Sequence, residues 1–164
     1  MEANPSLGAI RFRAMGHVDL ESVMKIETQS YEFPWSRGTF EDCLAAPYEC
    51  WAVELGDREG RDRIVGYGIL HVSDDEAHLL NVCVGKQLRG SGFGREIVLY
   101  LVDRAKAQRA TKMFLEVRPS NGIARALYDS VGFHQIGVRK GFYPAFSGRE
   151  VGLVLALHLV VSNP

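Results

Sequence analysis

The sequence has few of the cysteines, and none of the cysteine–histidine spacings, that mark disulfide-rich secreted proteins and metal-binding proteins. Its 164 residues contain only three cysteines, Cys43, Cys50 and Cys83, which are odd in number and scattered, so they do not form a disulfide framework. We expect reduced, mostly buried thiols, as in a cytoplasmic protein. The five histidines show no ligand spacing with the cysteines, so we expect no metal site.

Long apolar runs and strong charge of one sign are also lacking. The longest apolar run, 153–161, is interrupted by His158 and is too short to span a bilayer. The first five residues, MEANP, have neither a basic region nor an apolar core, so we expect no secretory signal. A formal net charge of -1 gives no general attraction to nucleic acid or to acidic membranes. The length and composition predict one domain over 1–164.

One stretch, 79–104, organises the rest of the chain. The apolar run LLNVCV at 79–84 predicts a strand buried on both faces. A short linker leads to RGSGFGR at 89–95, after which apolar residues recur at helical spacing. Strand, glycine-rich loop and helix in this order suit an anion site, because the first turn of a helix has free N–H groups and the positive end of the dipole.

The spacing of the glycines narrows the choice of anion. Glycines at 90, 92 and 94 do not match the Gly-x-Gly-x-x-Gly pattern of dinucleotide sites, and Gly94 is followed by Arg95 rather than by the Lys-Ser or Lys-Thr of nucleotide-triphosphate loops. An ordinary flexible loop is one alternative. The other is Arg-x-x-Gly-x-Gly at 89–94, which resembles the pyrophosphate loop of the GCN5-related N-acetyltransferases (GNAT), enzymes that bind acetyl-CoA.

The other elements are expected from periodicity, caps and breakers. We expect strands at 10–13, 49–55, 64–72, 113–117, 134–138 and 153–161. We expect helices at 19–31, after Ser36, and from a cap at Ser120 or Asn121 to Gly132, with a solvated loop at 56–63 and a longer connection at 139–149. This order predicts an α+β fold with an antiparallel first half and a parallel strand–helix–strand crossing in the centre. It is also the layout of the GNAT fold, a mixed central sheet flanked by helices, so the resemblance covers nearly the whole chain.

Glu116 is the titratable residue that the pattern leaves unexplained. It stands alone in the apolar segment MFLEV at 113–117, where loss of hydration suits a general base. A structural pairing with Arg118 or Arg139 is equally consistent with the sequence. In the helix that follows, Asn121 and Tyr128 share one face. Taken alone, however, Tyr128 could equally be an aromatic residue of the core.

Several further motifs make the resemblance more specific. They are the segment 27–44, which contains FPWS at 33–36, together with LEVRPSN at 115–121, ALY at 126–128, GF at 132–133 and GRE at 148–150. Together they resemble the GNAT enzymes that acetylate the N-terminal alanine of a small-subunit ribosomal protein. The resemblance implies that Glu116 is the proton acceptor and Tyr128 the proton donor. It implies direct transfer of the acetyl group, with an N-terminal peptide of that ribosomal protein as the partner.

The same resemblance implies a set of cofactor contacts. The backbone of Val82, Cys83 and Val84 would hold the pantetheine arm, and Asn121 a polar part of acetyl-CoA. The pyrophosphate would be bound by Arg89, Gly90, Ser91, Gly92, Phe93, Gly94 and Arg95. Cys83 lies in an apolar strand without a positioned histidine, so we interpret it as a packing residue rather than a nucleophile.

Two aromatic, proline-containing segments are candidates for holding the acceptor peptide. We assign Phe33, Pro34 and Trp35 to one, and Tyr143 to the other, although either segment could instead seal the edge of the core. The chain has GREVG at 148–152 and Phe142 before Tyr143, where the family usually has Gly-Arg-Glu-Asp-Ala and paired tyrosines. These departures lie nearer the acceptor than the cofactor, so they bear on the identity of the substrate and not on the acetyl donor. Two alternatives stay open: an acetyltransferase of another protein N-terminus or of a small amine, and a non-catalytic acyl-CoA-binding sensor that keeps the same fold.

Overall fold

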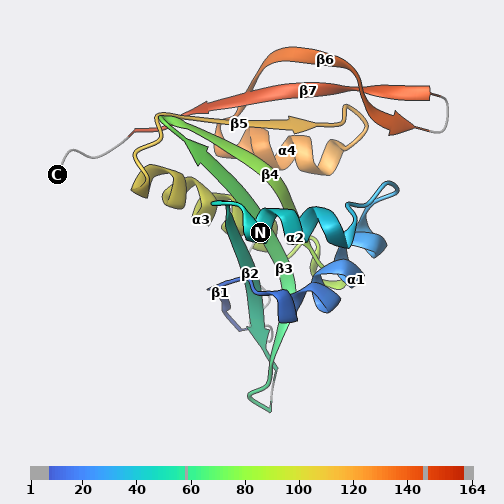
Figure 1. Ribbon diagram of the computed structural model, residues 1–164, viewed down its shortest axis with the longest axis vertical. Helices are drawn as coiled ribbons and strands as arrows, with labels where there is room; N and C mark the ends of the chain where they lie inside the picture. The colour runs from blue at the N-terminus through green and yellow to red at the C-terminus, as the bar shows by residue number, and fades with distance from the viewer. Residues whose placement is uncertain (1–7, 58, 146–147, 161–164) are drawn as a thin grey trace. The chain divides into compact units, whose positions relative to one another are not determined.

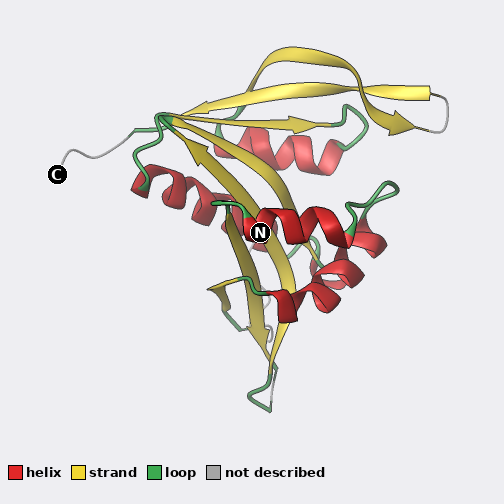
Figure 2. Ribbon diagram, viewed as in Figure 1, coloured by secondary structure: helices red, strands yellow, loops and turns green. Residues whose placement is uncertain are grey.

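The computed structural model describes residues 8–57, 59–145 and 148–160, without the side chains of 141–150. The described elements follow in the expected order (Figures 1 and 2): β1 (Ile10–Ala14), η1 (His17–Asp19), α1 (Leu20–Ser30), α2 (Arg37–Ala45), β2 (Glu49–Gly56), β3 (Asp62–Ser73), β4 (Glu76–Val84), η2 (Lys86–Leu88), α3 (Phe93–Ala107), β5 (Lys112–Val117), α4 (Gly122–Val131), β6 (His134–Ala145) and β7 (Gly148–His158). The strand order is β1-β2-β3-β4-β5-β7-β6. The α+β class is therefore confirmed.

Strand directions agree with the prediction. The pairs β1–β2, β2–β3, β5–β7 and β6–β7 are antiparallel, and β4 pairs with β5 in parallel. The parallel pairing joins 76–78 to 112–114, and α3 lies between these two strands in the sequence, as a parallel crossover requires. The chain divides into two compact units, Met1–His71 with Asn81–Leu101 and Val72–Leu80 with Val102–Pro164.

In the first unit, helices pack against both faces of the antiparallel strands. Side chains of α1 and α2 form one buried cluster with alternate residues of β2 and β3, among them Val23, Phe40, Ala52, Tyr67 and Ile69. On the opposite face the ring of Tyr100 from α3 stacks on Phe12 of β1, with ring centroids 3.8 Å apart. The alternation of side chains along each strand thus produces two apolar layers.

Two glycines of β3 allow α3 to approach this sheet closely. A Cβ atom at Gly66 would lie 3.2 Å from Ile97 Cδ1 of α3 and 2.7 Å from the carbonyl oxygen of Cys83 in β4, and one at Gly68 would lie 2.6 Å from Leu101 Cδ1 of α3. Neither position therefore accepts a side chain without a shift of its neighbours. The close approach fixes α3, and with it the glycine-rich loop at its start, relative to β3.

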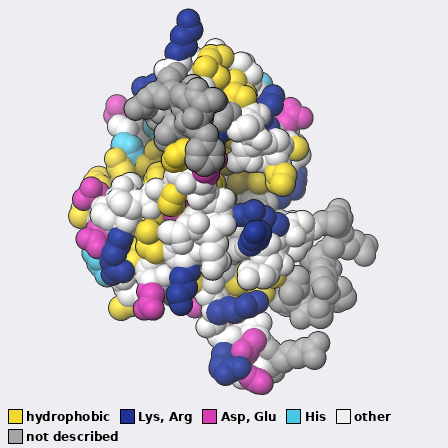
Figure 3. All heavy atoms as spheres, turned by 90° about the vertical axis from the view of Figure 1, so that its right-hand side faces the viewer, with side chains coloured by type: hydrophobic (Ala, Val, Ile, Leu, Met, Phe, Trp, Pro, Cys, Tyr) yellow, Lys and Arg dark blue, Asp and Glu magenta, His cyan; other side chains and the backbone are white. Residues whose placement is uncertain are grey.

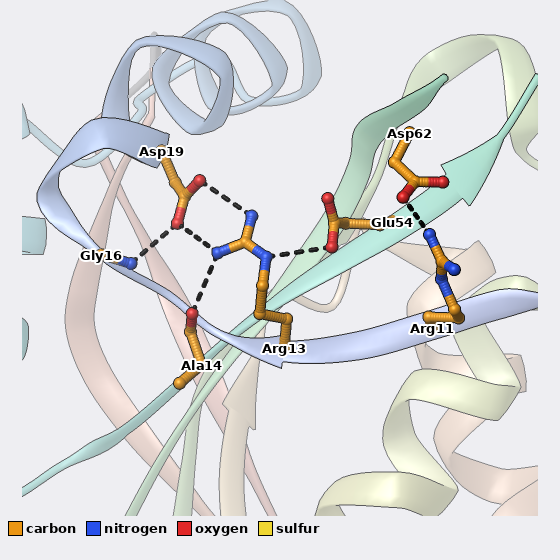
Figure 4. A network of polar contacts seen from close by, with 7 residues as sticks. All are labelled: Arg11, Arg13, Ala14, Gly16, Asp19, Glu54 and Asp62. Carbon is orange, nitrogen blue, oxygen red and sulfur yellow. Dashed lines mark hydrogen bonds and ion pairs between the residues drawn. The ribbon is translucent and has the colours of Figure 1, made fainter. Parts of the chain in front are cut away.

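A network of charged groups joins β1 to the start of α1 (Figure 4). Arg13 lies between two carboxylates, donating to both oxygens of Asp19 at 3.0 Å and to Glu54 Oε1 at 2.9 Å. Asp19 is buried and also accepts the backbone N–H of Gly16 at 2.7 Å. These bonds hold the pKa of Asp19 below its usual range, chiefly through the Arg13 guanidinium. Arg11 forms a separate, more exposed pair with Asp62.

In the second unit, β5 alternates between a buried and a half-buried face. Met113, Leu115 and Val117 are buried, whereas Phe114 and Glu116 are partly exposed. Helix α4 is capped at its start by Asn121, one of the two residues expected there, and at its end by Gly132, whose φ of 113° is a left-handed conformation that favours glycine.

Two predictions about strands were wrong. Strand β4 is not buried on both faces, because Leu80 is 39% exposed and only alternate residues are buried. The segment 139–149 is not a long connection, because β6 and β7 continue through it and pair as far as Ala145 with Gly148. Its glycine and proline suggested a loop, but β6 is an edge strand with an irregular register between Arg139 and Tyr143. Pro144 lies in this edge strand, where the missing N–H of a proline need not remove a hydrogen bond between strands.

The connection between β2 and β3 is charged, as predicted. Acidic and basic side chains gather at the lower end of the view in Figure 3. Within this connection, Arg61 pairs with Asp57 and Glu59. The three cysteines are free and buried, which confirms the expected thiols. Among the described residues, no helix has the length and apolar character needed to cross a membrane.

Candidate functional site

The glycine-rich loop has the backbone conformation that an anion site needs. Gly90 and Gly92 have φ angles of 82° and 88°, in the left-handed region that favours glycine. Between them, the hydroxyl of Ser91 donates to the carbonyl of Leu88 and so ties the loop to its own start. Arg89 and Arg95 at the two ends of the loop are exposed. The loop thus presents two cations around a tightly turned backbone.

Helix α3 begins inside this motif. The first N–H with a bond into the helix is that of Glu96, which donates to the carbonyl of Gly92 at 3.2 Å. The N–H groups of Phe93, Gly94 and Arg95 precede that bond and have no acceptor within the helix. Phe93 is 2% exposed and anchors this first turn in the core. Free N–H groups, the helix dipole and two guanidinium groups together suit a pyrophosphate.

The end of β4 carries the segment expected to hold the pantetheine arm. Cys83 is buried, and burial raises the pKa of its thiol, which agrees with a packing role rather than a nucleophilic one. The carbonyl of Val82 accepts a hydrogen bond from the hydroxyl of Tyr31 at 2.9 Å. Tyr31 follows the last residue of α1, so β4 is fixed to the end of that helix.

Glu116 lies on the half-buried face of β5. Its side chain is 25% exposed, and Oε1 accepts a hydrogen bond from Arg139 Nη1 at 2.9 Å. The sequence left the pairing with Arg118 or Arg139 open, and the structure shows the bond to Arg139. The second oxygen, Oε2, is buried and has no hydrogen-bond partner among the described residues. One oxygen is therefore held by a cation, while the other remains available as an acceptor.

The expected face of α4 is present. Asn121, Ala124 and Tyr128 are all half-buried. Asn121 Oδ1 caps the helix by accepting the N–H of Ala124 at 3.2 Å, which leaves the amide nitrogen for other contacts. The ring of Tyr128 meets Phe133 edge to face, with centroids 5.7 Å apart. That packing fixes the direction of the ring.

The segment Phe33-Pro34-Trp35 has one exposed and one packed end. Phe33 and Pro34 are exposed, whereas Trp35 packs on Phe40, with ring centroids 5.2 Å apart. Ser36 then caps α2, as predicted, by accepting the N–H of Thr39. Tyr143 lies in β6, where its backbone is paired with Glu150. Its side chain is outside the described part of the structure.

The sequence reasoning missed a buried polar cluster around Glu27. This carboxylate, on α1, is 1% exposed and accepts three hydrogen bonds, from Trp35 N, Tyr67 Oη and Asn81 Nδ2. A signal was available, because Glu27 follows Val23 by four residues and therefore lies on the apolar face of α1. A carboxylate on such a face needs buried donors.

The candidate residues divide between the two units. The segments 33–35, 82–84 and 89–95 belong to the first unit, and Glu116, Asn121, Tyr128 and Tyr143 to the second. Within the described ranges, no group of three or more His, Cys, Asp or Glu side chains could hold a metal ion.

Comparisons with known proteins agree with this set of features. The chain is 36% identical to the [ribosomal protein bS18]-alanine N-acetyltransferase of Haemophilus ducreyi over 142 residues, which are 86% of this chain and 94% of that protein. It is 32% identical to the enzyme of the same name from Escherichia coli K12 over 139 residues, 85% of this chain and 90% of that one.

The folds agree as well. The crystal structure of the ribosomal-protein-S18-alanine N-acetyltransferase from Escherichia coli superposes with a TM-score of 0.82 at 29% identity, covering 94% of this chain and 97% of that one. The family model "Acetyltransferase (GNAT) family" matches residues 20–133, more than half of the chain. On these grounds the chain belongs to the GNAT family of acetyltransferases.

Proposed function

We propose that this protein transfers the acetyl group of acetyl-CoA to the N-terminal alanine of ribosomal protein bS18. The observation that carries the proposal is the similarity, over most of both chains, to enzymes named for that reaction. Together with the family membership, it favours an enzyme over the acyl-CoA sensor. We further propose that residues 1–164 work as one domain, in the cytoplasm.

The acetyl donor would be held by the loop and by β4. Residues 89–95 would bind the pyrophosphate through the N–H groups of the first turn of α3 and through Arg89 and Arg95, as the turned backbone at Gly90 and Gly92 supports. The backbone of 82–84 would align the pantetheine arm, and the amide nitrogen of Asn121 would contact a polar group of the cofactor. The chemistry that acetyl-CoA supplies is an activated thioester carbonyl.

The residues proposed for proton transfer are Glu116 and Tyr128. Glu116 would take a proton from the alanine ammonium, directly or through water, and its Oε2, which has no hydrogen-bond partner among the described residues, supports this role. The amine then attacks the thioester carbon, the C–N bond forms and the C–S bond breaks. A backbone N–H of 82–84 would polarise the carbonyl, and Tyr128 would protonate the departing thiolate. Arg139 would keep the Glu116 carboxylate in place.

The acceptor peptide would lie against Phe33, Pro34, Trp35 and Tyr143. The exposure of Phe33 and Pro34 supports this proposal, because a peptide needs an accessible apolar surface. If it holds, Trp35→Ala and Tyr143→Ala raise the KM for peptide more than the KM for acetyl-CoA. The opposite pattern would remove the segment from the acceptor site.

Thiol release from acetyl-CoA tests the proposal directly. The peptides would carry the same sequence except for alanine, serine or methionine at the first position, and an N-terminally blocked lysine peptide and a polyamine would be assayed separately as alternative acceptors. We expect turnover on the alanine peptide, reduced by roughly two to four orders of magnitude in Glu116→Gln and by less in Tyr128→Phe. Glu21→Gln, an exposed glutamate on α1, is the control and keeps wild-type activity.

The other outcomes separate the remaining functions. Turnover only on the lysine peptide or the polyamine would keep the mechanism and discard the N-terminal substrate. Binding of acetyl-CoA without turnover on any amine would favour the sensor.

A further inference from the structure

The buried cluster around Glu27 joins three separate parts of the first unit. Oε2 of Glu27 accepts the backbone N–H of Trp35 at 2.8 Å, eight residues further along the chain. Oε1 accepts the hydroxyl of Tyr67 from β3 and, at 3.0 Å, the amide of Asn81 from β4. The mechanism proposed above does not use this carboxylate. A buried charge without a catalytic task needs another explanation.

The bond to Trp35 fixes the segment assigned to the acceptor. The chain between Tyr31 and Trp35 is held at both ends, by the Tyr31 hydroxyl on the carbonyl of Val82 at 2.9 Å and by the Trp35 N–H on Glu27. The residues between these anchors, 32–34, are exposed. Both ends of the segment are thus tied to the interior, and only its middle faces solvent.

The bond to Asn81 ties the same carboxylate to the donor strand. Asn81 directly precedes the residues assigned to the pantetheine arm, and Val82 itself carries the Tyr31 bond. Glu27 therefore contacts, through its two oxygens, both the segment assigned to the acceptor and the strand assigned to the donor. A side chain that holds the binding sites of both reactants in place contributes by orienting the reactants, without taking part in the bond changes.

We infer that Glu27 is a positioning residue that holds the acceptor segment 33–35 against the donor strand β4, and so sets the affinity for the acceptor peptide. The inference rests on the proposed function for its consequence in catalysis. It assigns to Glu27 a role in binding the peptide, and none in binding acetyl-CoA.

The role requires a carboxylate, because three donors converge on two acceptor oxygens. Glutamine has one oxygen and an NH₂ group, which cannot accept a hydrogen bond from an N–H. In Glu27→Gln the side chain keeps most bonds when its oxygen faces Tyr67 and Asn81. The NH₂ group then faces the Trp35 N–H, and the anchor of the acceptor segment is lost.

Steady-state kinetics of Glu27→Gln test this inference. We expect the KM for the alanine peptide to rise about tenfold, the effect of losing one charge-assisted hydrogen bond, while the KM for acetyl-CoA stays unchanged. Tyr67→Phe is the matched control: it removes another donor from the same carboxylate and leaves the Trp35 bond in place. It should lower stability without raising the KM for peptide.

A second measurement does not depend on turnover. The chain has two tryptophans, Trp35 and Trp51, so Trp51→Phe leaves Trp35 as the only tryptophan fluorophore. In that background, Glu27→Gln should increase acrylamide quenching of Trp35, and Tyr67→Phe and Glu21→Gln should not.

Three results would overturn the inference: unchanged peptide KM and quenching in Glu27→Gln, an equal rise of both KM values, or the same change in Tyr67→Phe. A wild-type protein inactive on every peptide would overturn the proposed function instead. The quenching data would still decide whether Glu27 anchors Trp35.

Discussion

Helix α1 has a buried carboxylate at each end, and the two are held by opposite kinds of partner. Asp19, just before the helix, is 6% exposed and lies against the guanidinium of Arg13. Glu27, in the last turns, is 1% exposed, and its hydrogen bonds come from a backbone N–H, a phenol and an amide. The first is an ion pair that reaches solvent, and the second is a buried charge among neutral donors.

The difference indicates different tasks. Arg13 is 42% exposed, so solvent screens part of its attraction to Asp19, and the pair serves to join β1 to α1. The donors around Glu27 come from three separate segments, and the carboxylate itself is closed to solvent. We therefore expect the end of α1 to respond more strongly to substitution than its start.

The largest effect is expected from Glu27→Leu. This change leaves three donors, one on a buried and two on half-buried residues, without their acceptor, and we expect the free energy of unfolding to fall by about 3–5 kcal/mol. Urea unfolding followed by circular dichroism measures it. A loss similar to that of a surface substitution would mean that the three donors find other acceptors, and the contrast between the two ends would disappear.

Asp19→Asn should cost less, about 1–2 kcal/mol. An asparagine oxygen still accepts the N–H of Gly16 or a bond from Arg13, and Arg13 keeps Glu54 and its contact with solvent. The same unfolding assay applies, with Asp62→Asn as the control. Its partner Arg11 is 61% exposed, so the control should change stability by less than about 0.5 kcal/mol. A larger loss in Asp19→Asn than in Glu27→Leu would reverse the comparison.

Periodicity and breakers predicted most of the fold, because the elements depend on local signals. The caps at Ser36 and Asn121, the left-handed Gly132 and the parallel crossing were all accessible from side-chain chemistry and spacing. The continuation of β6 and β7 through 139–149 could not be predicted in this way, because Pro144 is tolerated in a strand only at the edge of a sheet. That position depends on the order of the strands, which no local pattern contains.

The candidate site could be predicted only where its residues are close in sequence. The loop 89–95 is one continuous motif, so the spacing of its glycines was enough to predict an anion site there. The cluster of Glu27, Tyr67 and Asn81 spans 54 residues and forms only when α1, β3 and β4 pack together. The roles of Glu116 and Tyr128 remain predictions that the assays above test.

The dependence of stability on pH gives a smaller effect, which tests whether Asp19 acts through its charge. Because Arg13 lowers the pKa of Asp19 in the folded protein, this carboxylate contributes stability above its unfolded pKa of about 3.9. That contribution is lost as the pH falls from about 4 through the folded pKa, since the unfolded chain then binds the proton more readily. The difference in stability between wild type and Asp19→Asn should thus shrink as the pH falls toward 3. A difference independent of pH would assign the effect to hydrogen bonding rather than charge.

The smallest expected effect is that of salt, and it separates the two carboxylates most directly. Raising the ionic strength from about 0.01 to 1 M shortens the Debye length from about 30 to 3 Å. The destabilisation in Asp19→Asn should then fall by a few tenths of a kcal/mol, because Arg13 is open to solvent. The destabilisation in Glu27→Leu should not change, because its partners are neutral and the carboxylate is buried. Equal salt dependence at the two sites would mean that solvent ions reach Glu27, and the distinction between an ion pair at the start of α1 and a closed cluster at its end would be wrong.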